Sequence, residues 1–351
     1  MIQQAIEELV EGRDLSPEEV GETVREIADS RATPAQVGAF LAALRQKGET
    51  PAELAAFAST LREYSVRISP RVRGRLVDTC GTGGDRVKTF NVSTLSAVVA
   101  AGAGASVAKH GNRSVTSKCG SADLLERLGF NLDMKPEAVK ASIEEIGLGF
   151  MFAPTFHPAM KAVGPVRREL GVRTIFNLMG PLLNPAGASA QVVGVYDPGL
   201  VAKVAEALGR SGVQEAMVVH GLEGMDEISI EGETAVARLR GGEVKVGSLS
   251  PQDFGIQKTK VPVGEVQSVE DGARVAIEVL GGGMRGSPTE KMVLVNSAAA
   301  LVVGGLADDV GDAMDLARAS LEGGEALKKL RQLVEASGGD SSRVEVYAAS
   351  S

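Results

Sequence analysis

The sequence has few cysteines, no excess of positive charge and no long hydrophobic run, and each absence excludes a class of protein. Only Cys80 and Cys119 are present, and their spacing fits neither a zinc site nor a Cys-x-x-Cys motif, so we expect two reduced thiols in a cytoplasmic protein. The net charge is −8, from 37 Lys and Arg against 45 Asp and Glu. A general nucleic-acid-binding surface is therefore unfavourable, because neutralising phosphates needs surplus cations. The weakly polar stretches 96–108 and 292–306 are too short and too rich in Gly and Ala to span a membrane.

The remaining composition is that of an ordinary globular protein, with 44% hydrophobic and 23% charged residues. At 351 residues the chain is long enough for a large core and for more than one domain. Residues 1–8 form an acidic amphipathic pattern and lack the basic stretch and apolar run of a secretory signal, so we expect no such signal.

Residues 1–70 have the pattern of a small all-helical domain. Ser16, Thr33 and Thr50 each precede a proline and stand three residues before Glu or Gln. This is the arrangement of a capping box with proline at the first helical position. Apolar residues then recur at helical spacing, so we expect four short helices, with Ser69-Pro70 at the exit.

Residues 71–351 have the pattern of a large α/β domain. Short β-branched runs at 192–196, 215–219 and 291–295 alternate with Ala-rich helical stretches at 201–211 and 297–303. That alternation predicts a layered α/β structure with a mostly parallel sheet.

Three further segments carry local predictions. Residues 165–183 have helical spacing and many basic residues, and we expect part of 165–185 to join the helical domain. Residues 231–247 alternate in polarity around a Gly-Gly pair and predict a hairpin. The polar residues 337–351 predict a loosely held end.

The most distinctive segment is Asp78-Thr-Cys-Gly-Thr-Gly-Gly-Asp85, between a short apolar strand and a helix expected over residues 90–102. Three glycines remove the Cβ atoms that would keep a ligand off the backbone. The N–H groups of the turn and of the helix start can then converge on an anion. The segment is neither a Walker loop nor a dinucleotide fingerprint. An ordinary tight turn is the alternative, and the phosphate cradle gains its support from segments further along the chain.

Residues 109–117, Lys-His-Gly-Asn-Arg-Ser-Val-Thr-Ser, combine cations, an amide and three hydroxyls. These are the donors that phosphate and carboxylate oxygens need, although a solvated basic loop remains the alternative. Residues 120–123, Gly-Ser-Ala-Asp, lead into an apolar helix. Ser121 or a neighbour is expected to cap that helix and to contact a ligand.

Two proline-containing segments, 152–160 and 164–168, are expected to be fixed loops that present His157 and Arg167. Arg is the natural partner of a substrate carboxylate, whereas His157 is equally well explained as a buried structural residue. Residues 177–185 are apolar and interrupted by Gly and Pro. They would either wall a pocket for a flat organic group or form an ordinary connection.

Asp226 and Glu227 follow the strand expected at 216–219, close to its carboxyl end. Ligands of open α/β sheets usually bind on that side. Adjacent carboxylates beside a phosphate cradle suit Mg²⁺, which prefers a few carboxylate oxygens together with substrate phosphates. An isolated exposed acidic pair is the alternative.

Taken in order, these segments resemble the anthranilate phosphoribosyltransferase family over essentially the whole chain. The resemblance rests on the helical start and on residues 81–85, 91–94, 109–117, 120–123, 173–185 and 226–227. It implies the α/β fold of the nucleoside phosphorylase and phosphoribosyltransferase type. The family transfers the phosphoribosyl group of 5-phosphoribosyl 1-diphosphate (PRPP) to the amine of anthranilate in tryptophan biosynthesis, with release of pyrophosphate. The resemblance further implies about two Mg²⁺ ions per monomer, a homodimer formed through the N-terminal helices, and no nucleic-acid or membrane partner.

The resemblance also implies a site, residue by residue. The implied PRPP-binding residues are Gly81, Gly84, Asp85, Thr89, Asn91, Val92, Ser93, Thr94, Lys109, His110, Gly111, Asn112, Arg113, Ser114, Val115, Thr116, Ser117 and Ser121. The implied anthranilate-binding residues are Gly81, Asn112, His157, Arg167 and Pro181. The implied Mg²⁺ ligands are Ser93, Asp226 and Glu227. Thr116 and Cys119 depart from the family, which usually has Ser at both positions.

The implied reaction is a dissociative displacement at ribose C1, because the anthranilate amine is a weak nucleophile. Mg²⁺ and the glycine-loop donors would stabilise the departing pyrophosphate. No residue is an obligatory general base, and His110 is the one candidate for taking the product proton. Two alternatives stay open: a pyrimidine nucleoside phosphorylase, whose loop reads Lys-His-Ser-Thr-Gly-Gly, and a nucleic-acid-binding relative, which would need a basic face.

Overall fold

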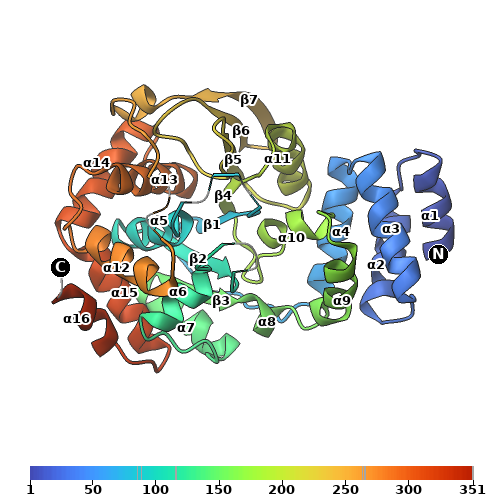
Figure 1. Ribbon diagram of the computed structural model, residues 1–351, viewed down its shortest axis with the longest axis horizontal. Coiled ribbons are helices and arrows are strands. Elements are labelled where there is room, and N and C mark those ends of the chain that lie inside the picture. The colour runs from blue at the N-terminus through green and yellow to red at the C-terminus, as the bar shows by residue number, and fades with distance from the viewer. Residues whose placement is uncertain (85, 88, 115–116, 263, 265, 350–351) are drawn as a thin grey trace.

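The computed structural model describes residues 1–84, 86–87, 89–114, 117–262, 264 and 266–349. Figure 1 shows a small bundle of helices beside a larger α/β body, with the N-terminus at the far end of the bundle. The expected combination of a helical unit and a mostly parallel α/β unit is confirmed.

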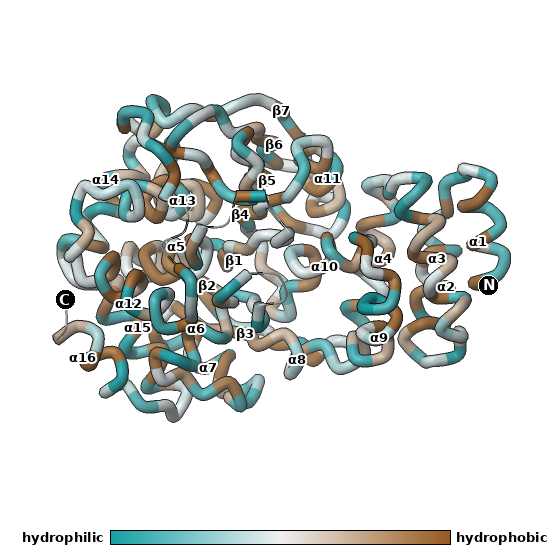
Figure 2. Tube along the Cα trace, in the orientation of Figure 1, coloured by the Kyte–Doolittle hydropathy of each residue, from teal (hydrophilic) through white to brown (hydrophobic). Residues whose placement is uncertain are grey.

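The bundle begins with four helices, as the sequence predicts. They are α1 (Ile2–Val10), α2 (Pro17–Ala28), α3 (Pro34–Lys47) and α4 (Pro51–Glu63). Ser16, Thr33 and Thr50 each accept the backbone N–H of the third helical residue, and all three capping boxes are complete. Each cap contributes about 1 kcal/mol to helix stability. Hydrophobic and hydrophilic residues alternate along these helices (Figure 2), and apolar residues of all four helices lie in one core.

The large body is built on one seven-stranded sheet with the order β3-β2-β1-β4-β5-β6-β7. Its strands are β1 (Leu76–Gly81), β2 (Ser106–Gly111), β3 (Leu148–Phe152), β4 (Ala190–Gly194), β5 (Glu215–Gly221), β6 (Thr234–Arg240) and β7 (Glu243–Leu249). The first five strands are parallel, and β6 and β7 form the expected antiparallel hairpin.

The two faces of the sheet belong to two different cores. Val192 and Met217 lie in the larger core, on the face covered by α5 (Val92–Gly102) and α13 (Pro288–Gly304). Their neighbours Val193 and Val218 point to the other face and share one core with the helical bundle and α11 (Val201–Arg210). The bundle is therefore joined to the sheet through α11, which packs against α4 on one side and β5 and β6 on the other.

The remaining helices complete the two bodies. They are α6 (Ser121–Arg127), α7 (Pro136–Ile146), α8 (Ala153–Phe156), α9 (Met160–Leu170), α10 (Phe176–Leu182), α12 (Val269–Leu280), α14 (Val310–Glu322), α15 (Glu325–Ala336) and α16 (Ser342–Ala348), with short 3₁₀ turns η1 (Pro198–Leu200) and η2 (Pro251–Phe254). Helix α9 packs against α2 and α3, and α10 packs against α4. Among the described residues no helix is long and apolar enough to cross a membrane.

Three local predictions are wrong. Residues 291–295 are not a strand but part of α13, which begins at the Ser287 cap with Pro288 at its first position. This helix is buried on nearly all sides, so its apolar residues show no helical period. Residues 153–156, 164–168 and 177–182 are not loops but lie in α8, α9 and α10, each of which contains a proline. The helical spacing expected over 165–183 is confirmed in α9 and α10. The described part of the C-terminal segment is not loose, since α16 buries Val344 and Tyr347.

Candidate active site

The candidate site lies at the carboxyl ends of β1 and β4. The chain connects β1 to β2 on one side and later inserts β4 on the other side of β1. The strand order therefore reverses between β1 and β4, which is where open α/β sheets form their ligand crevices. The glycine loop follows β1, as the sequence predicts.

The glycine loop is fastened to the turn that carries the acidic pair. The N–H of Gly83 donates to Asp226 Oδ2 at 2.7 Å, and the N–H of Thr82 donates to the Gly194 carbonyl at 2.9 Å. A Cβ atom on Gly81 would lie 2.2 Å from Asp226 Oδ2, and one on Gly194 would lie 1.6 Å from the Asp226 carbonyl oxygen. Only glycine at these two strand ends leaves room for the turn.

Two arginines hold the far side of the loop. The backbone N–H of Arg86 donates to the Gly224 carbonyl at 2.8 Å. The guanidinium of Arg173 donates to the Gly84 carbonyl and stacks 4.3 Å from the centre of the Tyr196 ring. Arg173 belongs to the connection between α9 and α10, so a segment that packs on the helical bundle supports the glycine loop directly.

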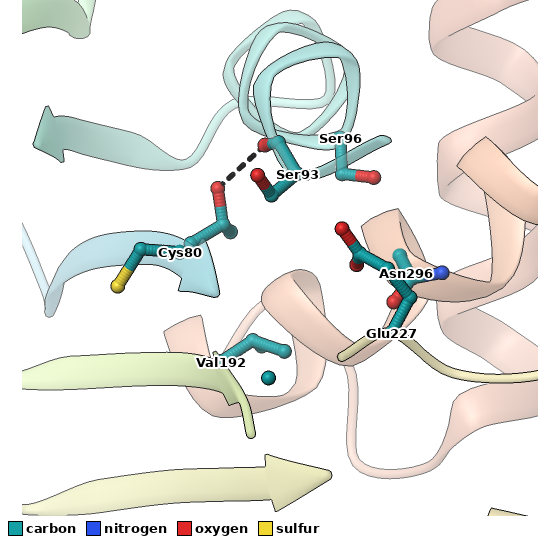
Figure 3. A pocket seen from close by; sticks show the side chains of 8 residues that line it. Cys80, Ser93, Ser96, Val192, Glu227 and Asn296 are labelled. Atoms are coloured by element: carbon teal, nitrogen blue, oxygen red, sulfur yellow. Dashed lines mark hydrogen bonds between the residues drawn. The ribbon is translucent and has the colours of Figure 1, made fainter. Parts of the chain in front are cut away.

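A small cavity lies between the start of α5 and the acidic turn (Figure 3). Its volume of about 10 Å³ matches one water molecule. The residues that line it are Thr79, Cys80, Ser93, Ser96, Val192, Gly194, Glu227 and Asn296. The Thr79 hydroxyl donates to the Ser93 carbonyl at 2.8 Å and so fixes the start of α5 against β1. The fold thus brings Ser93 and Glu227, 134 positions apart in the numbering, to one cavity.

The donor set around this cavity fits a hard divalent cation only with help from a substrate. Ser93 and Glu227 present hydroxyl and carboxylate oxygens, and Asp226 adds a second carboxylate beside the glycine loop. Within the described part of the chain, no three His, Cys, Asp or Glu side chains come close enough to hold a metal by themselves. Mg²⁺ commonly binds through one or two carboxylates and completes its shell with phosphate oxygens and water. The residues present therefore fit a metal–diphosphate complex.

Lys109 and Asp78 occupy the gap where β1 and β2 separate. The paired register ends at Val77 and Val107. Beyond it, the Asp78 carboxylate accepts the N–H of His110 at 3.1 Å, and the Lys109 ammonium donates to the Thr79 carbonyl at 2.6 Å. Burial raises the pKa of Asp78, and the nearby Lys109 charge opposes that rise. The Lys109 ammonium thus lies between β1 and β2 and bonds a carbonyl that a backbone N–H of the neighbouring strand would otherwise bond.

Asn184 reinforces the same gap from the loop after α10. Its side-chain N–H₂ donates to Asp78 Oδ2 at 2.7 Å and to the Ala108 carbonyl at 2.9 Å. The sequence indicated Asn184 only as part of the apolar segment 177–185, because an amide that bridges two strands leaves no local signature.

The loop that follows β2 is closed at its neck by Ser121 and Asp123. Ser121 Oγ accepts the N–H of Asn112 and donates to its carbonyl, both at 3.2 Å. The Asp123 carboxylate accepts the N–H groups of Ser114 at 2.9 Å and Gly120 at 3.0 Å. Partial burial raises the pKa of Asp123, but these bonds and one from Arg113 outweigh it, so the pKa is lowered.

Arg113 and Ser121 therefore have structural partners in this loop. Arg113 forms ion pairs with Asp123 and Glu126, and the N-cap of α6 is Gly120, whose N–H is bonded by Asp123 and not by Ser121. The expectation that Ser121 or a neighbour caps α6 is therefore confirmed for the neighbour Gly120.

His110 and His157 form a buried pair. Their ring centres lie 5.0 Å apart in an edge-to-face arrangement, and the side chains are 7% and 6% exposed. His110 Nδ1 lies 3.1 Å from the Gly180 carbonyl and must donate to it. His157 Nδ1 lies 2.8 Å from Ser65 Oγ, which itself donates to the Leu61 carbonyl.

Both rings are therefore protonated on Nδ1 and bare on Nε2. Within the described part of the chain, each Nε2 is buried without a hydrogen-bond partner. Burial lowers the pKa of His110 to about 4, and burial together with the neighbouring His110 lowers that of His157 to about 3. The fold thus presents two neutral rings, each with an acceptor nitrogen.

Of the other predicted anthranilate contacts, Pro181 and Arg167 lie on the helices that join the two bodies, whereas Gly81 ends β1 and Asn112 lies in the loop after β2. Pro181 is buried in α10, next to the Gly180 carbonyl that His110 contacts. Arg167 projects from α9 with its guanidinium 5.4 Å from the Phe176 ring centre, and burial lowers its pKa. Asn112 accepts the N–H of Arg113 at 2.8 Å through its side-chain oxygen.

The remaining predicted residues are placed as follows. Thr89 Oγ1 faces the Phe90 carbonyl, Asn91 donates to the Cys119 carbonyl at 3.1 Å, and Val92 and Thr94 are buried in the first turn of α5. Gly111 ends β2 against Ser121, while the hydroxyls of Ser114 and Ser117 contact each other at 2.7 Å. Asp85, Val115 and Thr116 lie outside the described residues.

Two family models match the chain. Residues 73–327 match the α/β domain of a glycosyl transferase family, and residues 3–65 match the helical bundle domain of a glycosyl transferase family. Together they cover both bodies of the fold.

Curated relatives and solved structures agree with this match. The chain is 46% identical over 339 residues to an anthranilate phosphoribosyltransferase from Persephonella marina, covering 97% of this chain and 100% of the relative. It is 48% identical to that from Methanocorpusculum labreanum, covering 97% and 99%. The crystal structure of anthranilate phosphoribosyltransferase from Thermus thermophilus superposes with a TM-score of 0.88 at 41% identity, covering 95% of this chain and 99% of the other. The Saccharomyces cerevisiae enzyme in complex with PRPP and Mg superposes with a TM-score of 0.86 at 27% identity, covering 96% and 98%.

Proposed function

The chain belongs to the anthranilate phosphoribosyltransferase family, and we propose that the crevice at the ends of β1 and β4 carries out this family's reaction. The reaction transfers the 5-phosphoribosyl group of PRPP to the amine of anthranilate in the synthesis of tryptophan. The C1–N bond forms, the C1–O bond to the diphosphate breaks, and one amine proton is released. The observation that carries the proposal is the meeting of the glycine loop and the acidic turn at the Gly83–Asp226 hydrogen bond.

The glycine loop would bind the diphosphate. Gly83 leaves the backbone open, since a Cβ atom there would meet no atom within 4 Å, and α5 begins directly behind the loop at Val92. The N–H groups of Thr82 and Gly83 are already bonded within the protein, so the diphosphate donors would come from the rest of the loop and the first turn of α5. The positive end of the helix dipole adds to them. Donors fixed in this way stabilise the charge that develops on the leaving diphosphate as the C1–O bond breaks.

Ser93, Asp226 and Glu227 would hold Mg²⁺ together with oxygens of the diphosphate, and we propose two ions per monomer. When bound, the cation neutralises charge on the leaving group. What the chain itself contributes is a rigid placement of these oxygens, because Asp226 is tied to the glycine loop and Ser93 is tied to β1.

His110, His157, Arg167, Asn112 and Pro181 would bind anthranilate. Arg167 would take the carboxylate, whose charge and planarity match a guanidinium. The bare Nε2 atoms of the histidine pair offer acceptors for the amine hydrogens. With a pKa of about 4, His110 orients an N–H bond but does not retain a proton at neutral pH. The proton therefore passes to water, and the rate enhancement comes from positioning, which is worth several kcal/mol.

The two bodies would close on the substrates. We propose that residues 1–70 and part of 165–185 form one unit, since α9 and α10 pack against α2, α3 and α4. Arg173 connects this unit to Gly84 in the diphosphate loop. A homodimer through the N-terminal helices and a cytoplasmic location, in keeping with the two free thiols, complete the proposal. Sedimentation of the purified protein measures its oligomeric state.

The deciding experiment mixes the purified protein with PRPP, anthranilate and Mg²⁺ and follows the loss of anthranilate fluorescence. Metal-dependent loss, abolished by EDTA, supports reaction, acceptor and cofactor together. No loss with PRPP still binding by calorimetry would move the acceptor elsewhere. No binding of PRPP would overturn the role of the glycine loop.

A further inference from the structure

Asn296, in the middle of α13, is a buried amide that the proposed reaction does not use. Its side chain is 2% exposed. Its Oδ1 accepts the backbone N–H of Ile228 at 3.0 Å, and its Nδ2 donates to the Ile228 carbonyl at 3.3 Å and to the Met292 carbonyl at 2.9 Å. Both amide hydrogens are engaged, and two of these three bonds go to a single residue outside the helix.

These bonds fix the acidic turn directly after Glu227. The turn is closed at its start by backbone bonds between Gly221 and Met225. Asp226 is then held by the glycine loop, and Ile228 is held by Asn296. Glu227 lies between two anchors that belong to different elements, so the direction of its side chain depends on both.

The same helix also fixes the segment that carries Ser93. Ser96 Oγ donates to the Val293 carbonyl of α13 at 3.2 Å, and Ser93 lies one turn earlier on α5. Val293 and Asn296 are three residues apart on α13 and share one side of the helix. Figure 3 shows the outcome: Ser93, Ser96, Glu227 and Asn296 gather around one small cavity.

We propose that Asn296 is a positioning residue for the cation–diphosphate site. It sets the separation between the Glu227 carboxylate and the Ser93 hydroxyl, because α13 holds the Glu227 turn through Asn296 and the Ser93 helix through Val293. Groups that orient a metal ligand through hydrogen bonds commonly change metal affinity by 10- to 100-fold, roughly, when they are removed. This inference rests on the proposed function of the site.

The test compares Asn296→Ala with Ser297→Ala. Ser297 is the next residue of the same helix, is fully buried, and donates its hydroxyl to the Val293 carbonyl. In Ser297→Ala the Ser96 hydroxyl still donates to that carbonyl and Asn296 still bonds Ile228, so the change disturbs α13 without releasing either anchor. Binding of Mn²⁺ in the presence of pyrophosphate is measured by calorimetry. The Mg²⁺ midpoint of anthranilate consumption at saturating PRPP is measured beside it, and thermal unfolding reports the fold.

The expected result is an Mn²⁺ affinity about tenfold or more weaker in Asn296→Ala, with Ser297→Ala close to the unchanged protein. The Mg²⁺ concentration at half-maximal activity should rise in parallel. The turnover rate of the variant should lie closer to that of the unchanged protein at saturating Mg²⁺ than at limiting Mg²⁺. If Asn296→Ala does not fold, Asn296→Ser, which keeps a hydroxyl near the Met292 carbonyl, takes its place. A folded Asn296 variant with unaltered Mn²⁺ affinity, or an equal loss in Ser297→Ala, overturns the inference. Failure of the unchanged protein to bind Mn²⁺–pyrophosphate would instead overturn the proposed function.

Discussion

Gly83 donates its backbone N–H to the Asp226 carboxylate at 2.7 Å, across 143 positions of sequence. This bond makes the glycine loop and the acidic turn one structural unit. A change that moves either segment therefore disturbs both the diphosphate cradle and the carboxylates beside it.

Gly194→Ala should abolish most of the activity while the protein stays folded. A Cβ atom there would lie 1.6 Å from the Asp226 carbonyl oxygen, so the acidic turn must move. A displacement of about 1 Å in a catalytic constellation can cost roughly 100-fold in rate. The measurement is kcat/KM for PRPP beside thermal unfolding. Gly247→Ala on the edge strand β7 is the control, because its Cβ atom would meet no atom within 4 Å. Activity in Gly194→Ala equal to that of the control would contradict the argument.

Asp226→Asn and Glu227→Gln should weaken metal-dependent turnover most at limiting Mg²⁺. Each change keeps the size of the side chain but removes a carboxylate charge, and we expect the Mg²⁺ midpoint to rise by about tenfold. The measurement is a Mg²⁺ titration of anthranilate consumption at fixed PRPP. Unchanged activity of both variants at limiting Mg²⁺ would refute the assigned role.

Lys109→Met should destabilise the fold more than it weakens PRPP binding. The change removes the donor to the Thr79 carbonyl and the charge beside the buried Asp78 carboxylate. Leaving the buried Asp78 carboxyl without the nearby positive charge costs about 3 kcal/mol or more of unfolding free energy. Urea unfolding and PRPP calorimetry separate the two effects, with exposed Lys118→Met as the control. Undiminished stability with weakened PRPP binding would make Lys109 a direct phosphate ligand instead.

The buried histidine pair should make the protein sensitive to mild acid. His110 and His157 have pKa values of about 4 and 3 in the folded state, against about 6.5 in the unfolded chain. Above pH 6.5 neither state is protonated, so the pair has no effect there. As the pH falls below 6.5, the histidines bind protons in the unfolded state but not in the folded state. The free energy of unfolding therefore declines until the pH reaches the folded pKa values.

Each histidine contributes a slope of up to about 1.4 kcal/mol per pH unit in that window. Urea unfolding at roughly pH 7.5, 6.5, 5.5 and 4.5 measures how the free energy of unfolding changes over this pH range. In His157→Gln the curve should be shallower, because one of the two groups no longer titrates. Carboxylates also titrate at the lower end, so the difference between the two proteins is the decisive quantity. Parallel curves would show that the histidines do not control the acid response.

Much of the fold could be predicted from the sequence because the patterns that specify it involve residues close together in the chain. The capping boxes at Ser16, Thr33 and Thr50 depend on contacts within four residues, and all three formed. The alternation of β-branched and Ala-rich segments gave the α/β class, and the Gly-Gly pair at 241–242 gave the hairpin. The prediction failed where burial removed the period, as in α13, whose residues are apolar on nearly every side.

The sequence also predicted which segments form the site, but it did not predict the role of each residue in them. The sequence indicated that 81–85, 109–117 and 226–227 carry ligand-binding chemistry, because Gly-rich, cationic and acidic residues are unusual in such density. It did not indicate that Arg113 pairs with Glu126, that Ser121 closes a loop neck, or that the Lys109 ammonium lies between two strands. Side-chain direction depends on partners that are distant in sequence.

The sequence by itself determined the helical unit, the α/β class, the family resemblance and the residues with the right chemistry, since each of these is encoded in short-range pattern and composition. The tertiary structure alone decided which of those residues meet. It brought Gly194 and Asp226 into contact, set Ser93 opposite Glu227, gave both histidines a bare Nε2, and made Asn296 the support of the acidic turn. The reason is physical: those contacts join residues more than 30 positions apart, and the parallel sheet that brings them together is fixed by the packing of the whole chain.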